Sequence, residues 1–385
     1  MKILISSFSF HPNVNGISNV TIEHAKYFLS KGHEVTVVTS YDQDRSFKNI
    51  NGIEILEFKL KGSPLLYNFY RGEIFKYISF LKHAIYEYDL IYFHGWQVWA
   101  TDLFLFVKSK QSSAKVVMVS HCSPITTWST IPELVRAFLI LPYRALVMPI
   151  LMKKFNGLVF LSDKVDGDRQ WDYRYALKKH LNNKIHIIPN GMPKIDEHLN
   201  ISDTCALFMK KIGNAKILLY VANYDRVKNQ KLAIEVLSRI NTTTNHHLVF
   251  IGSDFNKHSD NLLKIIKNKK LENRVSVLSN LSRKEVLSFF SISYMTLFTS
   301  NSECYPLSVL ESLAYKKPVV ATDIGCISRI PSIMVSNNIS LLTEEVELLL
   351  DNNSYYSSKV KEISGKNKLP TWPETMKNYD NFMLD

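Results

Sequence analysis

The sequence has few of the residues that mark disulfide scaffolds and metal sites. Among its 385 residues are four cysteines, Cys122, Cys205, Cys304 and Cys326, which lie far apart and form no C-x-x-C pair. A disulfide framework and a cysteine-based zinc site are therefore not expected. The thiols are expected to be reduced, which favours a cytoplasmic protein.

Long hydrophobic runs are also absent. The first residues are too polar for the core of a signal peptide, and no small-residue cleavage site follows them. The most apolar stretch, residues 137–152, is shorter than a bilayer-spanning helix and is interrupted by Pro142 and Pro149. Two interpretations of this stretch remain open: a pair of core helices, or an interfacial membrane patch flanked by basic residues such as Lys153 and Lys154.

Acidic residues are too few to balance the basic ones. Lysine and arginine number 47 against 35 aspartates and glutamates, which gives a formal net charge of +12. This charge favours an anionic partner, namely a nucleic acid, a phosphorylated ligand or an anionic membrane. A hydrophobic content of 46% excludes wholesale disorder, and the length suits two α/β domains.

The common nucleotide-binding signatures are missing. The sequence contains no G-x-x-x-x-G-K-[ST] and no G-x-G-x-x-G after its first strand, so a P-loop enzyme and a nicotinamide or flavin enzyme lose support. Residues 10–16 follow that strand instead. They form either an ordinary loop or a backbone-lined ligand site at the carboxyl end of a sheet.

Short apolar runs alternate with helical patterns in two series, which a polar stretch at residues 193–204 separates. Strands that are nearly all apolar indicate parallel sheets covered on both faces. The expected fold is α/β, with two doubly wound, Rossmann-like domains that face a cleft. We expect the first domain over residues 1–195, the second over 196–365, and a tail over 366–385 whose helix crosses back to the first domain. The predicted strands are 3–6, 34–39, 53–58, 90–93, 115–120, 158–161 and 185–188 in the first series, and 217–221, 248–251, 275–278, 295–298 and 319–321 in the second.

The most informative segment is residues 300–311. Glu303 is expected in a loop after a strand, and Glu311 on a helix that begins near Pro306. Free amides at the start of that helix favour a phosphate, and a carboxylate beside it accepts hydrogen bonds from sugar hydroxyls. Taken alone, two acids eight positions apart are usually solvated surface residues.

Together with other motifs, this segment resembles the E-x7-E region of glycosyltransferase family 4, the retaining group 1 enzymes with the GT-B fold. The motifs occur in the order found in that family and span roughly residues 1 to 325. They are Asn15-Gly16, Gly32-His33-Glu34-Val35-Thr36-Val37-Val38-Thr39, Ile188-Pro189-Asn190-Gly191, Lys228-Asn229-Gln230, residues 300–311, Lys317-Pro318-Val319-Val320-Ala321-Thr322 and Gly325.

The resemblance implies a nucleoside-diphosphate sugar held mainly by the second domain and an acceptor on the first. Glu303 would bind hydroxyls of the donor sugar, Glu311 the ribose and Lys228 the departing diphosphate. His121 matches the histidine that faces the donor sugar, although a satisfied core histidine remains the alternative. The implied catalytic residues are His121, Glu303 and Lys228. The implied donor-binding residues are Asn15, Gly16, Asn223, Arg226, Lys228, Glu303, Cys304, Tyr305, Pro306 and Glu311.

Some positions leave alternatives open. His94 and Trp96 lie at the end of another first-domain strand, where they either line the acceptor side or pack in the core. The family normally has Gly-Arg after the first strand of the second domain, where this chain has Ala222-Asn223. Either Arg226 takes over the contact with the diphosphate, or stabilisation of the leaving group is weaker.

No metal or other cofactor is expected, because a lysine and backbone amides can stabilise a departing diphosphate. Two D-x-D triplets, at residues 42–44 and 166–168, are interpreted as surface loops. The sequence thus favours a retaining glycosyltransferase that extends a glycan, with a lipid-linked precursor of a surface polysaccharide as acceptor, at the inner face of the membrane.

The lipid link rests on the net charge and on the apolar and basic stretch at residues 137–154, which together favour contact with an anionic membrane. The alternative is a catalytically degenerate GT-B subunit that acts as a binding partner or regulator. Asn223 supports that alternative, whereas the presence of Glu303, Glu311, Lys228 and His121 opposes it. A nucleic-acid partner is not expected, since no recognition motif is present.

Overall fold

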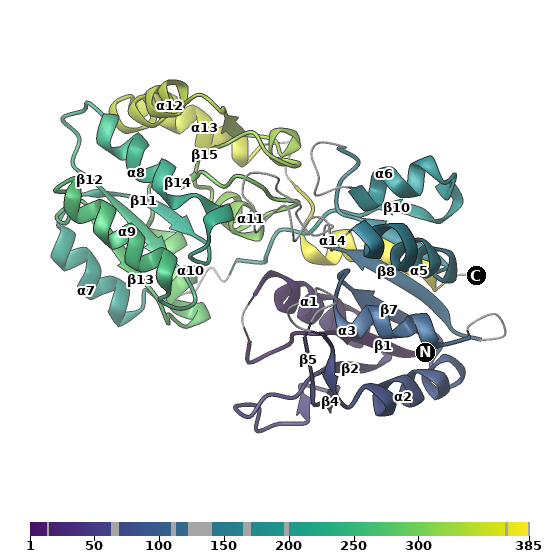
Figure 1. Ribbon diagram of the computed structural model, residues 1–385. Coiled ribbons are helices and arrows are strands. Elements are labelled where there is room, and N and C mark those ends of the chain that lie inside the picture. Colours follow the sequence, from purple (N-terminus) through teal and green to yellow (C-terminus); the bar gives the residue numbers. More distant parts are fainter. Residues whose placement is uncertain are drawn as a thin grey trace. The chain divides into compact units, whose positions relative to one another are not determined.

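The computed structural model describes residues 1–13, 15–62, 69–108, 113–121, 141–164, 171–195, 200–365 and 369–383. It divides the chain into two compact units, which Figure 1 shows coloured along the sequence. The first unit consists of residues 1–190 and 373–385, and the second of residues 191–372. The border therefore lies at Asn190 and Gly191, a few residues before the predicted one, and the last segment of the chain groups with the first unit.

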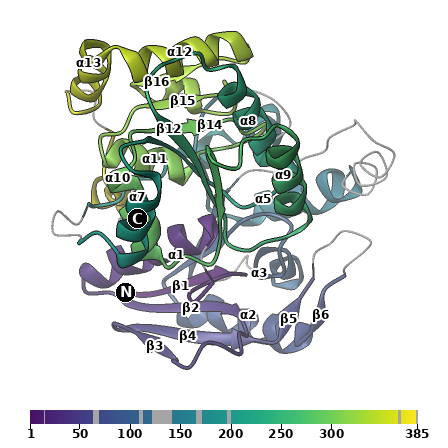
Figure 2. The same ribbon diagram turned by 90° about the vertical axis from the view of Figure 1, so that its left-hand side faces the viewer.

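The first unit is built on an eight-stranded sheet in the order β10-β9-β8-β7-β1-β2-β4-β3 (Figures 1 and 2). Its neighbouring strands are parallel except for β3 and β4. The strand order reverses between β1 and β7. A separate antiparallel pair joins β5 to β6. The strands are β1 (Lys2–Ser7), β2 (Glu34–Ser40), β3 (Asn49–Ile50), β4 (Ile53–Phe58), β5 (Leu60–Lys61), β6 (Arg71–Gly72), β7 (Leu90–His94), β8 (Lys115–Ser120), β9 (Gly157–Phe160) and β10 (Ile185–Ile187).

Successive side chains of a strand point to opposite faces of the sheet. Because these strands are largely apolar, both faces carry apolar side chains, and helices cover both. On β7, Phe93 packs against Phe104 and Phe155 on one face, whereas Tyr92 stacks on Phe28 of α1 on the other. The helical segments of this unit are α1 (Gly16–Ser30), α2 (Ile74–Glu87), α3 (Trp99–Asp102), η1 (Leu103–Phe106), η2 (Tyr143–Val147), α5 (Met148–Lys154), α6 (Trp171–Lys178), η4 (Asn182–Lys184) and, from the last segment of the chain, α14 (Trp372–Met376) and η7 (Lys377–Phe382).

The second unit contains a six-stranded sheet in the order β13-β12-β11-β14-β15-β16, in which every neighbouring pair is parallel. Here the strand order reverses between β11 and β14. The strands are β11 (Lys216–Val221), β12 (His246–Ile251), β13 (Val275–Leu278), β14 (Met295–Phe298), β15 (Val319–Ala321) and β16 (Ile333–Val335). The helical segments are α7 (Asp203–Ile212), η5 (Arg226–Lys228), α8 (Gln230–Arg239), α9 (Lys257–Asn268), α10 (Arg283–Ile292), α11 (Leu307–Ala314), η6 (Ile327–Arg329), α12 (Ile339–Asp351) and α13 (Asn353–Ile363).

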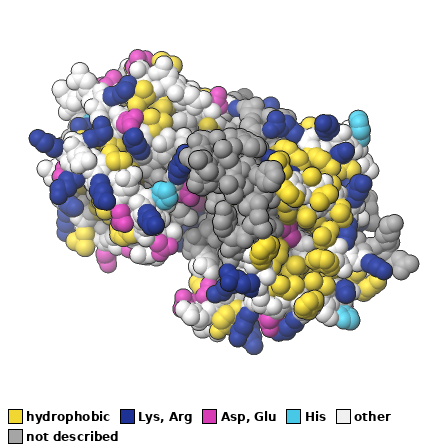
Figure 3. Space-filling view, in the orientation of Figure 1, with side chains coloured by type: hydrophobic (Ala, Val, Ile, Leu, Met, Phe, Trp, Pro, Cys, Tyr) yellow, Lys and Arg dark blue, Asp and Glu magenta, His cyan; other side chains and the backbone are white. Residues whose placement is uncertain are grey.

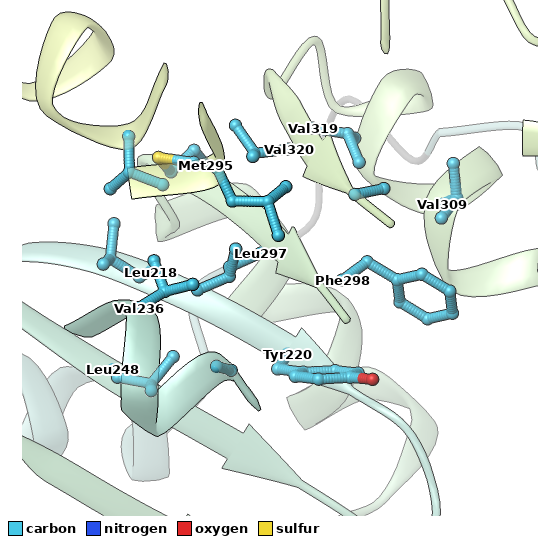
Figure 4. Packing of buried hydrophobic residues seen from close by; sticks show 14 of the residues in the cluster. Leu218, Tyr220, Val236, Leu248, Met295, Leu297, Phe298, Val309, Val319 and Val320 are labelled. Carbon is cyan, nitrogen blue, oxygen red and sulfur yellow. The ribbon is translucent and has the colours of Figure 1, made fainter. Parts of the chain in front are cut away.

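Apolar side chains from this sheet and its helices fill the core of the second unit. Figure 4 shows Leu218 and Tyr220 of β11 near Leu297 of β14, with Val236 of α8 packed against them. These side chains are at most 1% exposed. Full burial of an aliphatic or aromatic side chain of this kind stabilises a fold by about 1.5–3 kcal/mol. The carboxyl ends of β11 and β14 therefore project from a well-packed platform.

The predicted α/β architecture with two doubly wound, parallel-sheet units is confirmed. Each predicted strand is present, and its bounds differ from the expected ones by at most two residues. The strand β16 was not predicted, nor were β3, β5 and β6, which have two residues each and therefore too few for a periodic pattern. Within the described parts of the chain, no helix is both long and apolar enough to cross a bilayer.

The two segments that connect the units pair with each other. Met192 forms a parallel bridge with Thr371, and the Met192 amide donates to the carbonyl oxygen of Pro370 at 2.8 Å. A Cβ at Gly191 would lie 2.5 Å from the backbone nitrogen of Trp372, so only glycine fits there. The close packing of Gly191 explains the glycine of the Pro-Asn-Gly motif that ends the first series of strands, and α14 begins at Trp372 directly after the pairing.

Candidate functional site

The loops after β11 and β14 meet at the carboxyl edge of the second sheet. These strands are neighbours although β12 and β13 separate them in the chain. Open α/β sheets bind ligands at the place where the strand order reverses in this way. The loop after β11 carries Lys228 in η5, and the loop after β14 carries Glu303. The topology therefore brings two of the predicted site residues to one edge.

Hydrogen bonds fasten these two loops to each other. The Asn301 amide donates to the carbonyl oxygen of Val227 at 2.7 Å, and Ser300 Oγ lies 3.0 Å from the same oxygen. Tyr220 of β11 donates its hydroxyl to the carbonyl oxygen of Lys228. The turn that carries Lys228 is thus held from both the sheet and the neighbouring loop, and its backbone is fixed before any ligand binds.

Lys228 and Glu303 form an ion pair at this edge. Lys228 Nζ lies 2.5 Å from Glu303 Oε1, and the two side chains are 27% and 10% exposed. Ser300 Oγ lies 3.0 Å from the same carboxylate oxygen. Solvent screens such a pair less than it screens a pair on the open surface. The site therefore places a cation, which suits an anionic ligand group, beside an acceptor of hydroxyl hydrogen bonds.

Gly325 supports the backbone of Glu303 from the loop after β15. Its φ of +54° lies in the left-handed region, and a Cβ there would come within 2.2 Å of the Glu303 carbonyl oxygen. Next to it, Cys326 Sγ donates to the carbonyl oxygen of Cys304 at 2.7 Å. The close approach explains why the sequence has glycine at position 325, and it links a third loop to the position of Glu303.

Glu311 lies on α11, eight residues after Glu303, and is buried. Arg283, the first residue of α10, places a guanidinium nitrogen 2.5 Å from Glu311 Oε1. The Arg283 side chain is 39% exposed, whereas that of Glu311 is 7% exposed. No sequence motif marks Arg283, because its contact with Glu311 depends on how α10 packs beside α11.

The residues between the two glutamates form the start of α11. Pro306 precedes the helix and is buried, and no side chain of the described residues caps the first amides. Tyr305 is partly buried and packs against the core of the unit.

Cys205 and Cys326 are free thiols, but Cys304 is disulfide-bonded, so the expectation of reduced thiols is wrong for Cys304.

Asn223 and Arg226 lie in the same loop as Lys228, and both are exposed. Asn223 Oδ1 accepts the amide of Ser253 at 3.4 Å, and its carbonyl oxygen accepts Gln230 Nε2 at 2.9 Å. Arg226 begins η5, two positions before Lys228. The one-turn segment thus presents two basic side chains, while the asparagine serves the conformation of the loop.

In the first unit, Asn15 and Gly16 form the start of α1 at the carboxyl end of β1. Asn15 caps the helix by accepting the Ser18 amide at 2.9 Å, and it donates to Ser9 Oγ at 2.7 Å. A Cβ at Gly16 would meet nothing within 4 Å, and the residue does not have positive φ. The fold of the unit therefore does not require glycine at this helix start, and the space beside its backbone is open.

Arg45 holds the loop that precedes this helix start. Its buried guanidinium donates to the carbonyl oxygens of Phe10 and His11 at 3.2 and 2.7 Å, and it pairs with the carboxylate of Glu57. It also donates to the Ser40 carbonyl oxygen at 3.0 Å. Sequence analysis did not single out Arg45, because nothing local in its loop indicates a buried role.

His121 directly follows β8 and is partly exposed. Its Nε2 lies 3.0 Å from Nδ1 of His94, the last residue of β7. Burial lowers the pKa of His121 to about 4 and the pKa of His94 well below its usual value. Both rings are therefore neutral at pH 7. His121 lies at the carboxyl edge of the first sheet, where ligands of such sheets bind.

Trp96 and His94 are buried rather than exposed at this edge. Trp96 is 5% exposed, and its indole nitrogen donates to Asp172 Oδ2 at 2.8 Å. Ser120 Oγ donates to the same oxygen at 2.5 Å, and burial raises the pKa of Asp172. His94 is 0% exposed. Of the two interpretations that the sequence left open, the structure favours core packing for both residues.

The apolar stretch contains both buried and exposed side chains, and its interpretation as a membrane patch stays a prediction. Met148, Leu151 and Met152 are buried in the core, whereas Leu146 is 64% and Ile150 48% exposed. Two of its basic residues are also turned inward. Arg144 is buried with its guanidinium over the Trp171 ring, and Lys154 Nζ donates to carbonyl oxygens at the end of η1. Residues 137–140 lie outside the described residues, as does the triplet at 166–168.

Two family descriptions match the chain, one on each half. "Glycosyltransferase Family 4" matches residues 14–193, and "Glycosyl transferases group 1" matches residues 208–362. The two matches follow each other in the order in which the motifs of the family occur in the sequence. Residues 208–362 include the paired loops of β11 and β14, and residues 14–193 include α1 and His121.

Comparison with individual proteins gives the same fold. The curated relative N-acetyl-alpha-D-glucosaminyl L-malate synthase of Bacillus anthracis is 23% identical over 345 residues, which are 86% of this chain and 81% of the relative. Sucrose-phosphate synthase of Thermosynechococcus elongatus has a TM-score of 0.77 at 14% identity, over 99% of this chain and 98% of that chain. Anabaena Alr3699/HepE, solved with UDP and glucose, has a TM-score of 0.74 at 16% identity, over 100% of this chain and 99% of that chain.

Proposed function

This chain belongs to the group 1 glycosyltransferases of family 4, GT-B enzymes that use nucleoside-diphosphate sugars. We propose that it transfers the sugar of such a donor to a lipid-linked glycan, with retention of configuration at the anomeric carbon. The observation that carries the assignment of the donor site is the pairing of Lys228 with Glu303 where the strand order of the second sheet reverses.

The leaving group sets the main electrostatic demand. Transfer breaks the bond between the anomeric carbon and the diphosphate oxygen, which keeps the electron pair, while the acceptor oxygen forms the new glycosidic bond and loses its proton. Fixed positive charge near the diphosphate stabilises this charge separation. Lys228 supplies it, Arg226 adds to it from the same turn, and the uncapped first amides of α11 favour the same anion. This set needs no metal ion in the proposed mechanism.

The remaining donor contacts follow from the acceptors and amides at the same edge. Glu303 would release Lys228 to the diphosphate and accept hydroxyl hydrogen bonds from the sugar, beside the backbone of Cys304 and Tyr305. Glu311, buried and charge-compensated by Arg283, would accept the ribose hydroxyls. In the first unit the open backbone at Gly16 suits close approach of a phosphate, and His121 would face the donor sugar.

An exposed apolar face of the first unit supports a lipid-linked acceptor. Phe75 of α2 is 87% exposed, Phe106 of η1 59%, and Leu146 and Ile150 are also on the surface. Helix α2 contacts η1, and η1 contacts α5, so these elements are contiguous. Figure 3 shows hydrophobic side chains gathered over the first unit, with lysine and arginine side chains at their margin. We call Phe75, Phe106, Leu146 and Ile150 the apolar face.

Such a face, flanked by basic residues, matches the chemistry of an anionic membrane surface. Lys153 is exposed on α5, and the Lys76 side chain is 66% exposed on α2. The name of the Bacillus anthracis relative gives malate as the group joined to the sugar. A soluble acid acceptor is therefore the outcome that would contradict a lipid-linked acceptor.

The donor assignment is tested by nucleotide release. The wild-type protein and Glu303→Ala are incubated with UDP-, GDP- and ADP-sugars. Each donor is combined with membrane extract, with membrane from which organic solvent has removed the lipids, or with malate. We expect release with one donor, dependent on the lipid fraction and lost in Glu303→Ala. Release that persists in Glu303→Ala would remove the site, and release supported by malate but not by lipid would remove the lipid-linked acceptor.

Membrane contact is tested separately by sedimentation with vesicles. Leu146→Ser/Ile150→Ser is compared with a matched surface change on the second unit, Leu263→Ser, since Leu263 is 46% exposed on α9. We expect the double variant to bind anionic vesicles at least tenfold more weakly than wild type, and added salt to weaken the binding of all three proteins. Equal binding of the double variant and the control would contradict a role for the apolar face.

A further inference from the structure

His94 occupies a closed position at the carboxyl end of β7. Side chains alternate along that strand, so His94 shares a face with Tyr92, on the side covered by α1. Its ring packs edge-on against His24 of α1, with centroids 4.9 Å apart, and stacks on the His121 ring at 5.2 Å. Among the described residues, His94 thus packs against His24 on one side and contacts His121 at the carboxyl edge.

The single hydrogen bond between the two rings restricts where their protons lie. Burial keeps both imidazoles neutral at pH 7, so each ring carries one N–H and one lone pair. Nδ1 of His94 and Nε2 of His121 are 3.0 Å apart. One of these two nitrogens therefore carries the proton and the other accepts it, which gives two arrangements.

The surroundings of His94 Nε2 distinguish the two arrangements. This nitrogen is buried and has no hydrogen-bond partner within the described part of the chain. If His121 were the donor, the proton of His94 would sit on that nitrogen as a buried, unpaired N–H. If His94 is the donor, only a lone pair remains there. Unpaired buried N–H groups are rarer and less favourable than unpaired acceptors, so the second arrangement is preferred.

We propose that His94 is a positioning residue, which donates from Nδ1 to Nε2 of His121 and thereby holds His121 as the tautomer protonated at Nδ1. The inference rests on the proposed function, in which His121 faces the donor sugar. His121 then meets the sugar as a hydrogen-bond donor to one of its oxygens, and its Nε2 lone pair is already used. A histidine held in this way orients the sugar and does not remove a proton at Nε2.

The tautomers of the two histidines can be determined by NMR spectroscopy, without an assay of enzyme activity. Protein labelled with 15N at histidine gives two-bond proton–nitrogen correlation spectra, which separate Nδ1–H from Nε2–H rings. The signals are assigned with His94→Asn and His121→Ala. We expect both His94 and His121 as Nδ1–H rings at pH 7.5. A His121 ring protonated at Nε2 would overturn the proposal.

Two substitutions at His94 separate positioning from packing. Asparagine places an amide N–H close to the position of Nδ1, whereas leucine fills the space without a donor. We expect His94→Leu to lower kcat about tenfold with the donor KM within threefold, and His94→Asn to recover most of the loss. A His94→Leu protein with wild-type kcat would contradict the proposal. A thermal melt shows whether His94→Leu folds. If it does not, the tautomers of His121 in the wild-type protein and in His94→Asn decide whether His94 is a positioning residue.

Failure of the proposed function gives a different result. If wild-type protein releases no nucleotide from any donor, or if His121→Ala releases it at the wild-type rate, then His121 does not serve the donor and the site assignment falls. The spectra still decide whether His94 sets the tautomer of His121. If wild type is active and His121→Ala is not, an unchanged His94→Leu rejects the positioning role alone.

Discussion

Lys228 Nζ lies 2.5 Å from Glu303 Oε1, although 75 residues separate the two in the chain. The pair exists because β11 and β14 are neighbours in the sheet, so that the loops after them share one edge. Each partner holds the other in place in the free protein. A ligand that takes up either charge must exchange this contact for new ones, which couples the binding of the diphosphate to the binding of the sugar hydroxyls.

Lys228→Met should lower kcat by about 100-fold or more, because removal of one fixed charge from a leaving-group site typically costs that much. Steady-state nucleotide release measures it. Lys231→Met is the matched control, since Lys231 forms an exposed i,i+4 pair with Glu235. A Lys228→Met enzyme within fivefold of the control would contradict the role assigned to this lysine.

Glu311→Ala should weaken nucleotide binding by roughly tenfold or more, because hydrogen bonds to a charged group contribute about 1.5–3 kcal/mol. Calorimetric titration with UDP, GDP and ADP measures the change and identifies the base. Glu344→Ala, an exposed substitution on α12, serves as the control. Unchanged affinity for every nucleotide would place the ribose elsewhere.

Gly16→Ala should leave the free energy of unfolding within about 0.5 kcal/mol of wild type, because a Cβ at this helix start meets nothing in the unit. Under the proposed donor site, the same methyl group occupies the space next to the phosphates, so we expect kcat/KM to fall at least tenfold. Chemical denaturation and donor kinetics on one preparation test both parts. Equal kinetics would show that the open space is not used.

Arg45→Met should destabilise the first unit by about 3 kcal/mol, because it leaves the Glu57 carboxylate and three carbonyl oxygens without their buried donor. Differential scanning calorimetry resolves the transition, and Lys48→Met, at an exposed position of the same region, is the control. A loss below about 1 kcal/mol would mean that water replaces the guanidinium at little cost.

His24→Leu should reduce the acid sensitivity of the protein. Burial, with a smaller effect of the His121 charge, lowers the pKa of His24 to about 3 in the folded protein, against the ordinary histidine value of 6.5 in the unfolded chain. Above pH 6.5 the imidazole is neutral in both states. Between pH 6.5 and 3 the unfolded state binds the proton first, so stability is lost as pH falls, by about 2 kcal/mol at pH 5.

The leucine variant lacks this loss, so its free energy of unfolding should fall about 2 kcal/mol less between pH 7 and pH 5 than that of wild type. Urea titrations at the two pH values measure it. His83→Leu, at an exposed position of α2, should behave as wild type. An identical pH dependence of wild type and His24→Leu would mean that His24 is protonated in the folded protein.

The sequence predicted the strands because apolar runs are a local signal, and it predicted the start of α11 because Pro306 marks it. Contacts between elements that are distant in the chain could not be predicted from the sequence. The pairing of Arg283 with Glu311 depends on the relative position of two helices, and Arg45 contacts Glu57 and Phe10, which lie 12 and 35 positions away in the chain. His24 lies on the face of α1 where periodicity places apolar residues, so its ring neighbours could not be inferred from the pattern.

The return of the last segment of the chain to the first unit has a consequence for synthesis on the ribosome. Tyr379 and Phe382 pack into the first unit, where Phe382 lies so close to Gly157 that a Cβ would come within 2.4 Å of its ring. The polypeptide that completes the first unit is therefore translated after the whole of the second. Until residues 373–385 are made, the nascent chain carries a first unit that lacks two of its aromatic side chains, so this unit reaches its final stability only after the second unit has been translated.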